Sequence, residues 1–201
     1  MKYRLLNICF FFLSLYSHQL IDVKKINNTI VIDLRYATTN NFTGKKVYPK
    51  NLCYIHQDIA PLLNTIQNEL NYYDLGLKIW DAYRSIEAQQ TFWNIVHDSR
   101  YVSHPTKGRR VHLRGVAVDV TLVNLKTGKE LLMPSEFDDF SEKAYANYVK
   151  GIPAEAIENR QKLHTIMTKH GFIPESTEWW HFNIKNWGDY PILNITFEEL
   201  E

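Results

Sequence analysis

Apolar positions along the chain recur with two different periods, which separate predicted helices from predicted strands. From Asp58 to Tyr72 they recur every three or four residues, a pattern that predicts an amphipathic helix. A second helix is predicted from Pro153 to His170, where Gly171 closes it. A third is predicted to start after Ser85, a residue type that caps helices, and to run toward Val96.

Shorter apolar segments predict strands. Val116 to Val123 is the clearest, because its large apolar side chains alternate with the opposite-facing Ala117, Asp119 and Thr121. Four more strands are predicted, at Thr29 to Tyr36, Leu77 to Tyr83, Lys129 to Met133 and Trp179 to Ile184. Long helices beside mostly antiparallel strands indicate an α+β fold, with a sheet flanked by helices.

The length of the chain limits it to one domain of this kind. It has 201 residues, a normal apolar content of 45% and a net charge of +1. A net charge this small gives no indication of a polyanionic partner, so we expect neither nucleic acid nor an anionic membrane surface. The predicted domain spans residues 18–201.

The first 17 residues have a different character. Lys2 and Arg4 precede an apolar run from Leu5 to Leu15, which is typical of a secretory signal peptide and too short for a stable membrane span. We therefore predict a signal peptide over residues 1–17, export to a periplasm, and no membrane insertion of the mature chain. The alternative is a buried N-terminal strand or helix, in which case the protein stays in the cytoplasm.

Two short motifs carry residues suited to a metal. His112 and Asp119 lie seven residues apart on either side of Gly115, which can turn the backbone so that a loop residue and a strand residue converge. Glu178 and His181 lie together near the C-terminus. Two imidazoles and a carboxylate, with a second carboxylate to handle protons, form the set that a mononuclear zinc hydrolase requires.

The spacing of Glu178 and His181 leaves one question open. Residues three positions apart point to opposite faces of a regular strand. Both side chains can reach one metal only if Glu178 lies in the approach to the strand or if a bulge intervenes.

Arg84 follows directly on the predicted strand Leu77 to Tyr83. A guanidinium carries a permanent charge and several donors, so it can stabilise the oxyanion of a tetrahedral intermediate. The alternative is a surface arginine paired with Asp81 or Glu87.

These residues lie within motifs that resemble the D-alanyl-D-alanine dipeptidases of the vancomycin-resistance type, a group of zinc peptidases that act on cell-wall peptides. The resemblance runs from about Asp33 to Tyr190. It rests on ordered motifs: Asp33-Leu34-Arg35-Tyr36-Ala37-Thr38, Asn41-Phe42-Thr43-Gly44-Lys45, Trp80-Asp81-Ala82-Tyr83-Arg84, His112-x-x-Gly115-x-Ala117-x-Asp119, Phe137-Asp138, Gly171-Phe172 and Glu178-Trp179-Trp180-His181.

The resemblance implies a role for each matching residue. It implies one zinc ion per chain, held by His112, Asp119 and His181. It implies catalysis by Glu178, as general base and then acid, and by Arg84, as oxyanion stabiliser. Finally, it implies that Tyr36 and Asp138 bind the free amino end of a small D-amino-acid dipeptide, which zinc-activated water splits into two D-alanines.

Two positions depart from the family pattern. Relatives usually have a serine two residues before the first histidine ligand, in contact with the substrate carboxylate, and this chain has Arg110. Its guanidinium can bind that carboxylate bidentately or fill the pocket. The segment Met133-Pro134-Ser135-Glu136 also differs from the Met-Gly and small hydroxyl residue common in relatives.

Two alternative functions follow. The departures motivate a zinc dipeptidase or carboxypeptidase that acts on other cell-wall stem peptides. A non-catalytic zinc-containing module that binds cell-wall peptide is the other class, and it is expected to lack Glu178 or Arg84, both of which are present here.

Overall fold

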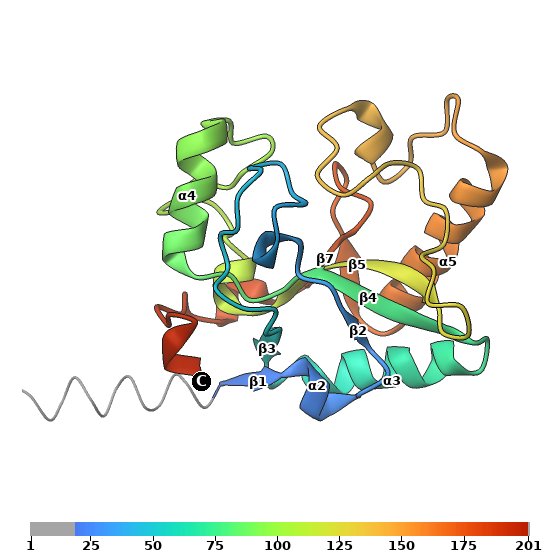
Figure 1. The fold of residues 1–201 in the computed structure, drawn as a ribbon, viewed down its shortest axis with the longest axis horizontal. Coiled ribbons are helices and arrows are strands. Elements are labelled where there is room, and N and C mark those ends of the chain that lie inside the picture. Colours follow the sequence, from blue (N-terminus) through green and yellow to red (C-terminus); the bar gives the residue numbers. More distant parts are fainter. Residues whose placement is uncertain (1–18, 201) are drawn as a thin grey trace, which may run out of the picture.

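The structure is a computed structural model that describes residues 19–200, drawn in colour in Figure 1. The predicted signal peptide lies outside the described residues and stays a prediction. Among the residues described, none forms a helix with the length and apolar content required to cross a bilayer.

Four α-helices are present in the described part of the chain: α2 (Val23–Ile26), α3 (Ala60–Asn71), α4 (Ile86–Val96) and α5 (Ala154–Lys169). The last three confirm the helices predicted from the apolar periodicity. The predicted cap of α4 is also confirmed, because Ser85 Oγ accepts a hydrogen bond from the backbone N–H of Ala88 at 3.2 Å.

The main sheet has five strands in the order β2 (Val31–Ile32), β4 (Leu75–Asp81), β5 (Ala117–Asn124), β7 (His181–Ile184) and β6 (Phe172–Pro174). Only the β2–β4 pair is parallel, and the other three pairs are antiparallel. A separate antiparallel pair joins β1 (Leu20–Asp22) to β3 (Tyr54–His56). The predicted α+β domain with a mostly antiparallel sheet is thus confirmed.

Short 3-10 helices fill several connections. They are η1 (Arg35–Ala37), η2 (His112–Arg114), η3 (Glu142–Ala144), η4 (Trp187–Asp189) and η5 (Glu198–Leu200).

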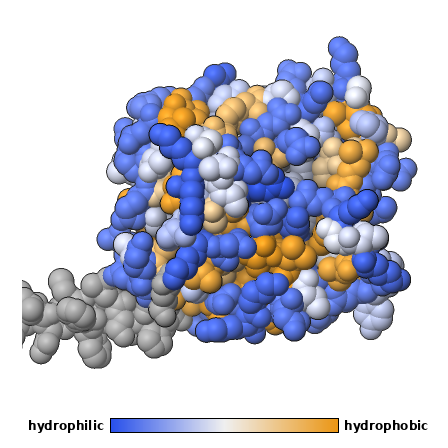
Figure 2. All heavy atoms as spheres, viewed as in Figure 1, coloured by the Kyte–Doolittle hydropathy of each residue, from blue (hydrophilic) through white to orange (hydrophobic). Residues whose placement is uncertain are grey.

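The central strand β5 is covered on both faces. All of its residues except Asn124 are buried, and α3 runs beneath the sheet with α5 beside it (Figure 1). Hydrophobic side chains are visible in a band where the sheet lies over α3, within an otherwise largely hydrophilic face (Figure 2). A strand buried in this way provides a rigid support for side chains that project from its end.

Two predicted strands are wrong in extent. Thr29 to Tyr36 contains only the two-residue β2, because the backbone N–H of Leu34 bonds to the side chain of Asn51 and η1 follows. Lys129 to Met133 makes a single bridge between Glu130 and Val123. The carboxylate of Glu130 instead pairs with Arg35 and Lys78, and Pro134 has no N–H to continue a ladder.

Candidate active site

Three buried side chains from different elements converge at one end of the sheet. His112 lies in η2, Asp119 in β5 and His181 at the first position of β7. Asp119 and His181 face each other in the antiparallel register, with His181 Nδ1 2.9 Å from Asp119 Oδ1. His112 Nε2 lies 3.2 Å from His181 Nδ1 and 3.5 Å from Asp119 Oδ1. One ligand atom from each residue lies within 4.8 Å of the others, which fits the N, N, O donor set of a zinc site.

The turn at Gly115 places His112 beside the strand. Gly115 has φ +67°, and a Cβ there would lie 2.8 Å from the Leu20 side chain and 3.1 Å from the backbone nitrogen of His56. Only glycine meets both constraints without strain. The predicted role of this residue in turning the backbone is confirmed.

The hydrogen bond of the His112 ring fixes which nitrogen faces the cluster. Nδ1 lies 2.7 Å from the carbonyl oxygen of Ala82, so it must donate there, and Nε2 faces Asp119 and His181. Histidine ligands of metals are usually held in this way by a bond from the other ring nitrogen. The donors therefore fit zinc in their identity, their spacing and their orientation.

The charge of Asp119 is balanced by its neighbours. Burial alone would raise the pKa of Asp119, but His112 and His181 outweigh that effect and hold it well below the ordinary range. The carboxylate is therefore ionised and suited to bind a cation.

Glu178 lies in the approach to β7 rather than in the strand, which resolves the spacing problem without a bulge. The backbone turns between them, with the N–H of His181 donating to the carbonyl of Glu178 at 3.1 Å. Glu178 Oε2 then lies 3.9 Å from His181 Nδ1, and the side chain is 30% exposed. Burial raises the pKa of Glu178 to about 7, a change that the negative charges of Asp119 and Asp138 reinforce and His181 opposes.

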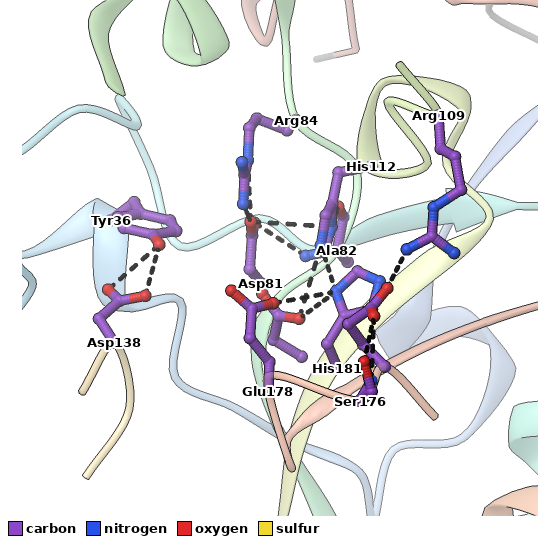
Figure 3. Close-up of polar contacts among 12 residues, drawn as sticks. Tyr36, Asp81, Ala82, Arg84, Arg109, His112, Asp138, Ser176, Glu178 and His181 are labelled. Carbon is purple, nitrogen blue, oxygen red and sulfur yellow. Dashed lines mark hydrogen bonds and ion pairs between the residues drawn. The ribbon is translucent and has the colours of Figure 1, made fainter. Parts of the chain in front are cut away.

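Arg84 pairs with Asp81, as the structural alternative expected, but this pair is buried. Arg84 Nη2 donates to Asp81 Oδ2 at 2.5 Å and Nε donates at 3.1 Å. Nη1 donates to the side chain of Gln89 at 2.9 Å. These bonds, of which those to Asp81 are drawn in Figure 3, hold the guanidinium at the cavity. It also lies over the rings of Phe92 and Tyr36.

Tyr36 and Asp138 face each other on one side of the site (Figure 3). The Tyr36 hydroxyl lies 3.0 and 3.1 Å from the two carboxylate oxygens of Asp138. Burial raises the pKa of Asp138 to about 7, and the charges of Asp119 and Asp81 act in the same direction. A carboxylate disfavoured in this way gains from a cationic ligand.

A cavity of about 260 Å³ connects these groups. All eight residues expected at the site line it: Tyr36, Arg84, Arg110, His112, Asp119, Asp138, Glu178 and His181. Arg110 has a left-handed backbone, with φ +47°. Among residues 19–200, the hydrogen bonds of its guanidinium are long, at 3.4 Å to the carbonyls of Gly108 and Pro105.

Three residues support Arg84, directly or through Asp81. Asp81 was named from the sequence only as its partner in the surface alternative, and Tyr48 and Gln89 were not named. Asp81 is fully buried and accepts bonds from Arg84, from the backbone of Ala82 and from the Tyr48 hydroxyl at 2.6 Å. Gln89 bridges Arg84 to the carbonyl of Ser103. An acidic residue inside an otherwise apolar strand, three positions before Arg84, was the signal for Asp81. Nothing local indicated Tyr48 or Gln89.

Comparison with known proteins places this arrangement in a family. A family model described as Peptidase_M15, D-ala-D-ala dipeptidase, matches residues 16–199. The D-alanyl-D-alanine dipeptidase of Escherichia coli K12 is 37% identical over 179 residues, 89% of this chain and 91% of its own. The dipeptidases of the same name from Enterococcus faecium and Streptomyces coelicolor are 33% and 30% identical, over 83% and 80% of this chain and 90% and 91% of their own.

A solved structure, VanYB in complex with D-Alanine-D-Alanine, overlaps 68% of this chain and 75% of its own at 17% identity. Its TM-score of 0.44 is too low for this overlap to carry an argument. The sequence matches do carry one, because they extend over nearly the whole described domain. The chain belongs to the Peptidase_M15 family of D-Ala-D-Ala dipeptidases and is a metallopeptidase.

Proposed function

We propose that the protein is a zinc-dependent dipeptidase that hydrolyses D-alanyl-D-alanine to two D-alanines. One observation carries this proposal: a three-residue donor cluster, a carboxylate, an arginine and an acidic amino-end site line one cavity. A volume of about 260 Å³ lies below the roughly 300–1,000 Å³ of pockets for drug-sized ligands, which favours a short peptide. The curated relatives named above share the activity in name.

His112, Asp119 and His181 would hold one zinc ion in this proposal. When bound, zinc supplies Lewis acidity and makes water available as a nucleophile near neutral pH. Three protein ligands leave a fourth position free for chemistry, as in other catalytic zinc sites.

Glu178 handles the protons. Its carboxylate stands beside His181 with a pKa raised to about 7, so it can accept a proton from water and then return it to the leaving amine. Arg84, oriented by Asp81 and Gln89, supplies donors for the developing oxyanion.

Asp138 and Tyr36 bind the free amino end of the substrate. Burial disfavours the ionised form of Asp138, and an ammonium bound beside it stabilises that form. A residue in the interior of a longer peptide has no free ammonium, so it cannot bind in this way. Arg110 binds the carboxylate at the other end, since its guanidinium has no carboxylate partner among the described residues.

A related peptidase of cell-wall stem peptides is the second candidate. The arginine at position 110 and the Pro134 segment favour it, because both alter the surroundings of the substrate. The presence of Glu178 and Arg84 in the cavity argues against a module that only binds peptide.

We also propose that the protein is exported, on the basis of residues 1–17. Cell fractionation with detection of the N-terminus tests this proposal. Full-length protein confined to the cytoplasm would contradict it.

The decisive experiment follows D-alanine release from D-Ala-D-Ala by the purified protein, with a chelator and with zinc added back. We expect release that the chelator abolishes and zinc restores. Tripeptides, pentapeptides and L-Ala-L-Ala serve as competing substrates. Turnover of a longer peptide in preference to the dipeptide would favour the second candidate.

Two variants separate metal binding from catalysis. Glu178→Gln should keep one zinc per chain and lose at least 10²-fold in kcat, in the range that general catalysis contributes. His181→Ala should lose the zinc itself, as measured by metal analysis. A loss of less than tenfold in Glu178→Gln would contradict the proposed role of this carboxylate.

A further inference from the structure

A second cavity of about 190 Å³ adjoins the catalytic cavity. The two cavities share part of their lining, including Glu178, Trp180, Tyr101 and Phe140. Ser141 and Tyr145 line the second cavity but not the first. Because Glu178 belongs to both walls, whatever fills the second cavity lies beside this carboxylate.

The walls of this cavity are tied to the catalytic segment by the backbone. The N–H of Trp179 donates to the carbonyl of Ala144 at 2.8 Å, and the N–H of Ala146 donates to Ser176 at 3.0 Å. Arg160 also donates to the carbonyl of Tyr145. These bonds fix the backbone that carries the walls of the cavity relative to the catalytic segment.

Aromatic side chains supply much of the lining and favour an apolar occupant: Tyr101, Phe140, Tyr145 and Trp180, with the Tyr101 and Phe140 rings 4.8 Å apart. Three charged residues also line the cavity. Arg100 is paired with Asp98 through bonds as short as 2.6 Å, and the carboxylates of Asp139 and Glu178 disfavour an anionic occupant. An apolar cavity of about 150 Å³ is sufficient for a benzene ring, so this one exceeds the needs of a methyl group.

The position of the cavity indicates which substrate residue it serves. It is lined by residues 139–141, directly after the amino-end carboxylate Asp138, and not by Arg109, Arg110 or Glu175 at the opposite end. The first residue of a dipeptide spans the interval between Asp138 and Glu178. Its side chain is therefore the one that can enter.

We propose that this second cavity is a side-chain subsite for the amino-terminal residue, so that the enzyme accepts D,D-dipeptides with a large apolar first residue. The proposal rests on the proposed dipeptidase function and extends its substrate class from D-Ala-D-Ala to dipeptides such as D-Phe-D-Ala.

The test compares kcat/KM for D-Ala-D-Ala, D-Phe-D-Ala and D-Ala-D-Phe with the zinc-loaded full chain. We expect D-Phe-D-Ala to be cleaved within about tenfold of D-Ala-D-Ala, and D-Ala-D-Phe to be cleaved at least tenfold more slowly than D-Phe-D-Ala. If the enzyme cleaves D-Ala-D-Ala but not D-Phe-D-Ala, the subsite is overturned and the proposed function is left intact. If it cleaves D-Phe-D-Ala but not D-Ala-D-Ala, the proposed function is overturned and the subsite is supported.

Variants locate the effect in this cavity. Ser141→Trp adds bulk to the second cavity and should lower the ratio of D-Phe-D-Ala to D-Ala-D-Ala turnover at least tenfold. Tyr145→Ala removes one aromatic wall and should raise KM for D-Phe-D-Ala.

Val149→Trp is the control variant. It adds the same bulk at an exposed position that lines neither cavity, and should leave the ratio unchanged. Equal ratios in Ser141→Trp and Val149→Trp, with both proteins folded by thermal melting, would refute the proposal.

Discussion

At the scale of single residues, the buried Arg84–Asp81 pair joins a proposed catalytic group to the stability of the fold. Asp81 is fully buried, and its two oxygens accept bonds from Arg84, Tyr48 and Ala82. Removing one partner of a buried pair leaves the other charge without compensation, which typically costs about 3–5 kcal/mol. The same pair therefore contributes to the fold and holds the guanidinium in the position that its proposed oxyanion role requires.

This linkage gives the first prediction. Arg84→Ala should lower kcat by about 10²–10³-fold, as loss of one oxyanion donor does, and should lower the free energy of unfolding. Arg109→Ala is the matched control, because Arg109 also lines the cavity but pairs with Glu175. Steady-state kinetics and thermal melting of both variants check this. An unchanged kcat in Arg84→Ala would leave Arg84 with a purely structural role.

A second residue-scale prediction concerns Asp138. Loss of a charge-assisted bond to the substrate ammonium is worth about 1.5–3 kcal/mol, so Asp138→Asn should raise KM by roughly 10- to 100-fold. Blocking the ammonium by N-acetylation should raise KM for the wild type and have little further effect on the variant. Additive effects of the two changes would contradict a direct contact.

The same carboxylate predicts a dependence on pH. Asp138 must be ionised to bind an ammonium, and its pKa is raised to about 7. KM should therefore rise as the pH falls through this pKa. A bound metal cation would lower the pKa of Asp138, so we expect the rise at or below pH 7. Asp138→Asn should lack this limb of the pH profile. Its persistence in the variant would assign it to another group.

At the scale of elements, Gly115 sets the relation between η2 and β5. Gly115→Ala places a methyl group 2.8 Å from the Leu20 side chain in a left-handed backbone, a conformation that itself costs about 1–2 kcal/mol. We expect a lower melting temperature and weaker zinc binding, because His112 would move relative to Asp119. Gly128→Ala is the control, with φ +71° but no atom within 4 Å of the added Cβ. Equal losses in the two variants would show that backbone strain alone is responsible.

Elements with a clear apolar period were the ones that the sequence could predict. The apolar face of α3 and the alternating large apolar side chains of β5 are both encoded by residues that lie close together in the sequence. The two-residue β2 could not be predicted in this way, because the side chain of the distant Asn51 captures the N–H of Leu34 and ends the strand. The position of Glu178 relative to β7 could not be predicted either, because it depends on the backbone turn between Glu178 and His181.

The same distinction holds for the site. The metal-ligand and carboxylate candidates were named because their chemical types occur in compact motifs, such as His112 to Asp119. Tyr36, Asp138 and Arg110 were named only through the resemblance to the family. The groups that orient them come from distant segments. Tyr48 reaches Asp81 across 33 residues of chain, and no local pattern encodes that contact.

At the scale of the whole molecule, zinc binding should add to the stability of the domain. The buried core around β5 extends well beyond the three ligands, so the metal is one contribution among many. A ligand that binds only the folded state stabilises it by about 2.7 kcal/mol at 100 times its Kd, which for a chain of this size shifts Tm upward by roughly 5–11 °C. Thermal melting with zinc and with chelator should show this shift in the wild type. It should persist in Glu178→Gln, which keeps all three ligands, and vanish in His181→Ala. A shift of equal size in His181→Ala would place the stabilising zinc elsewhere on the molecule.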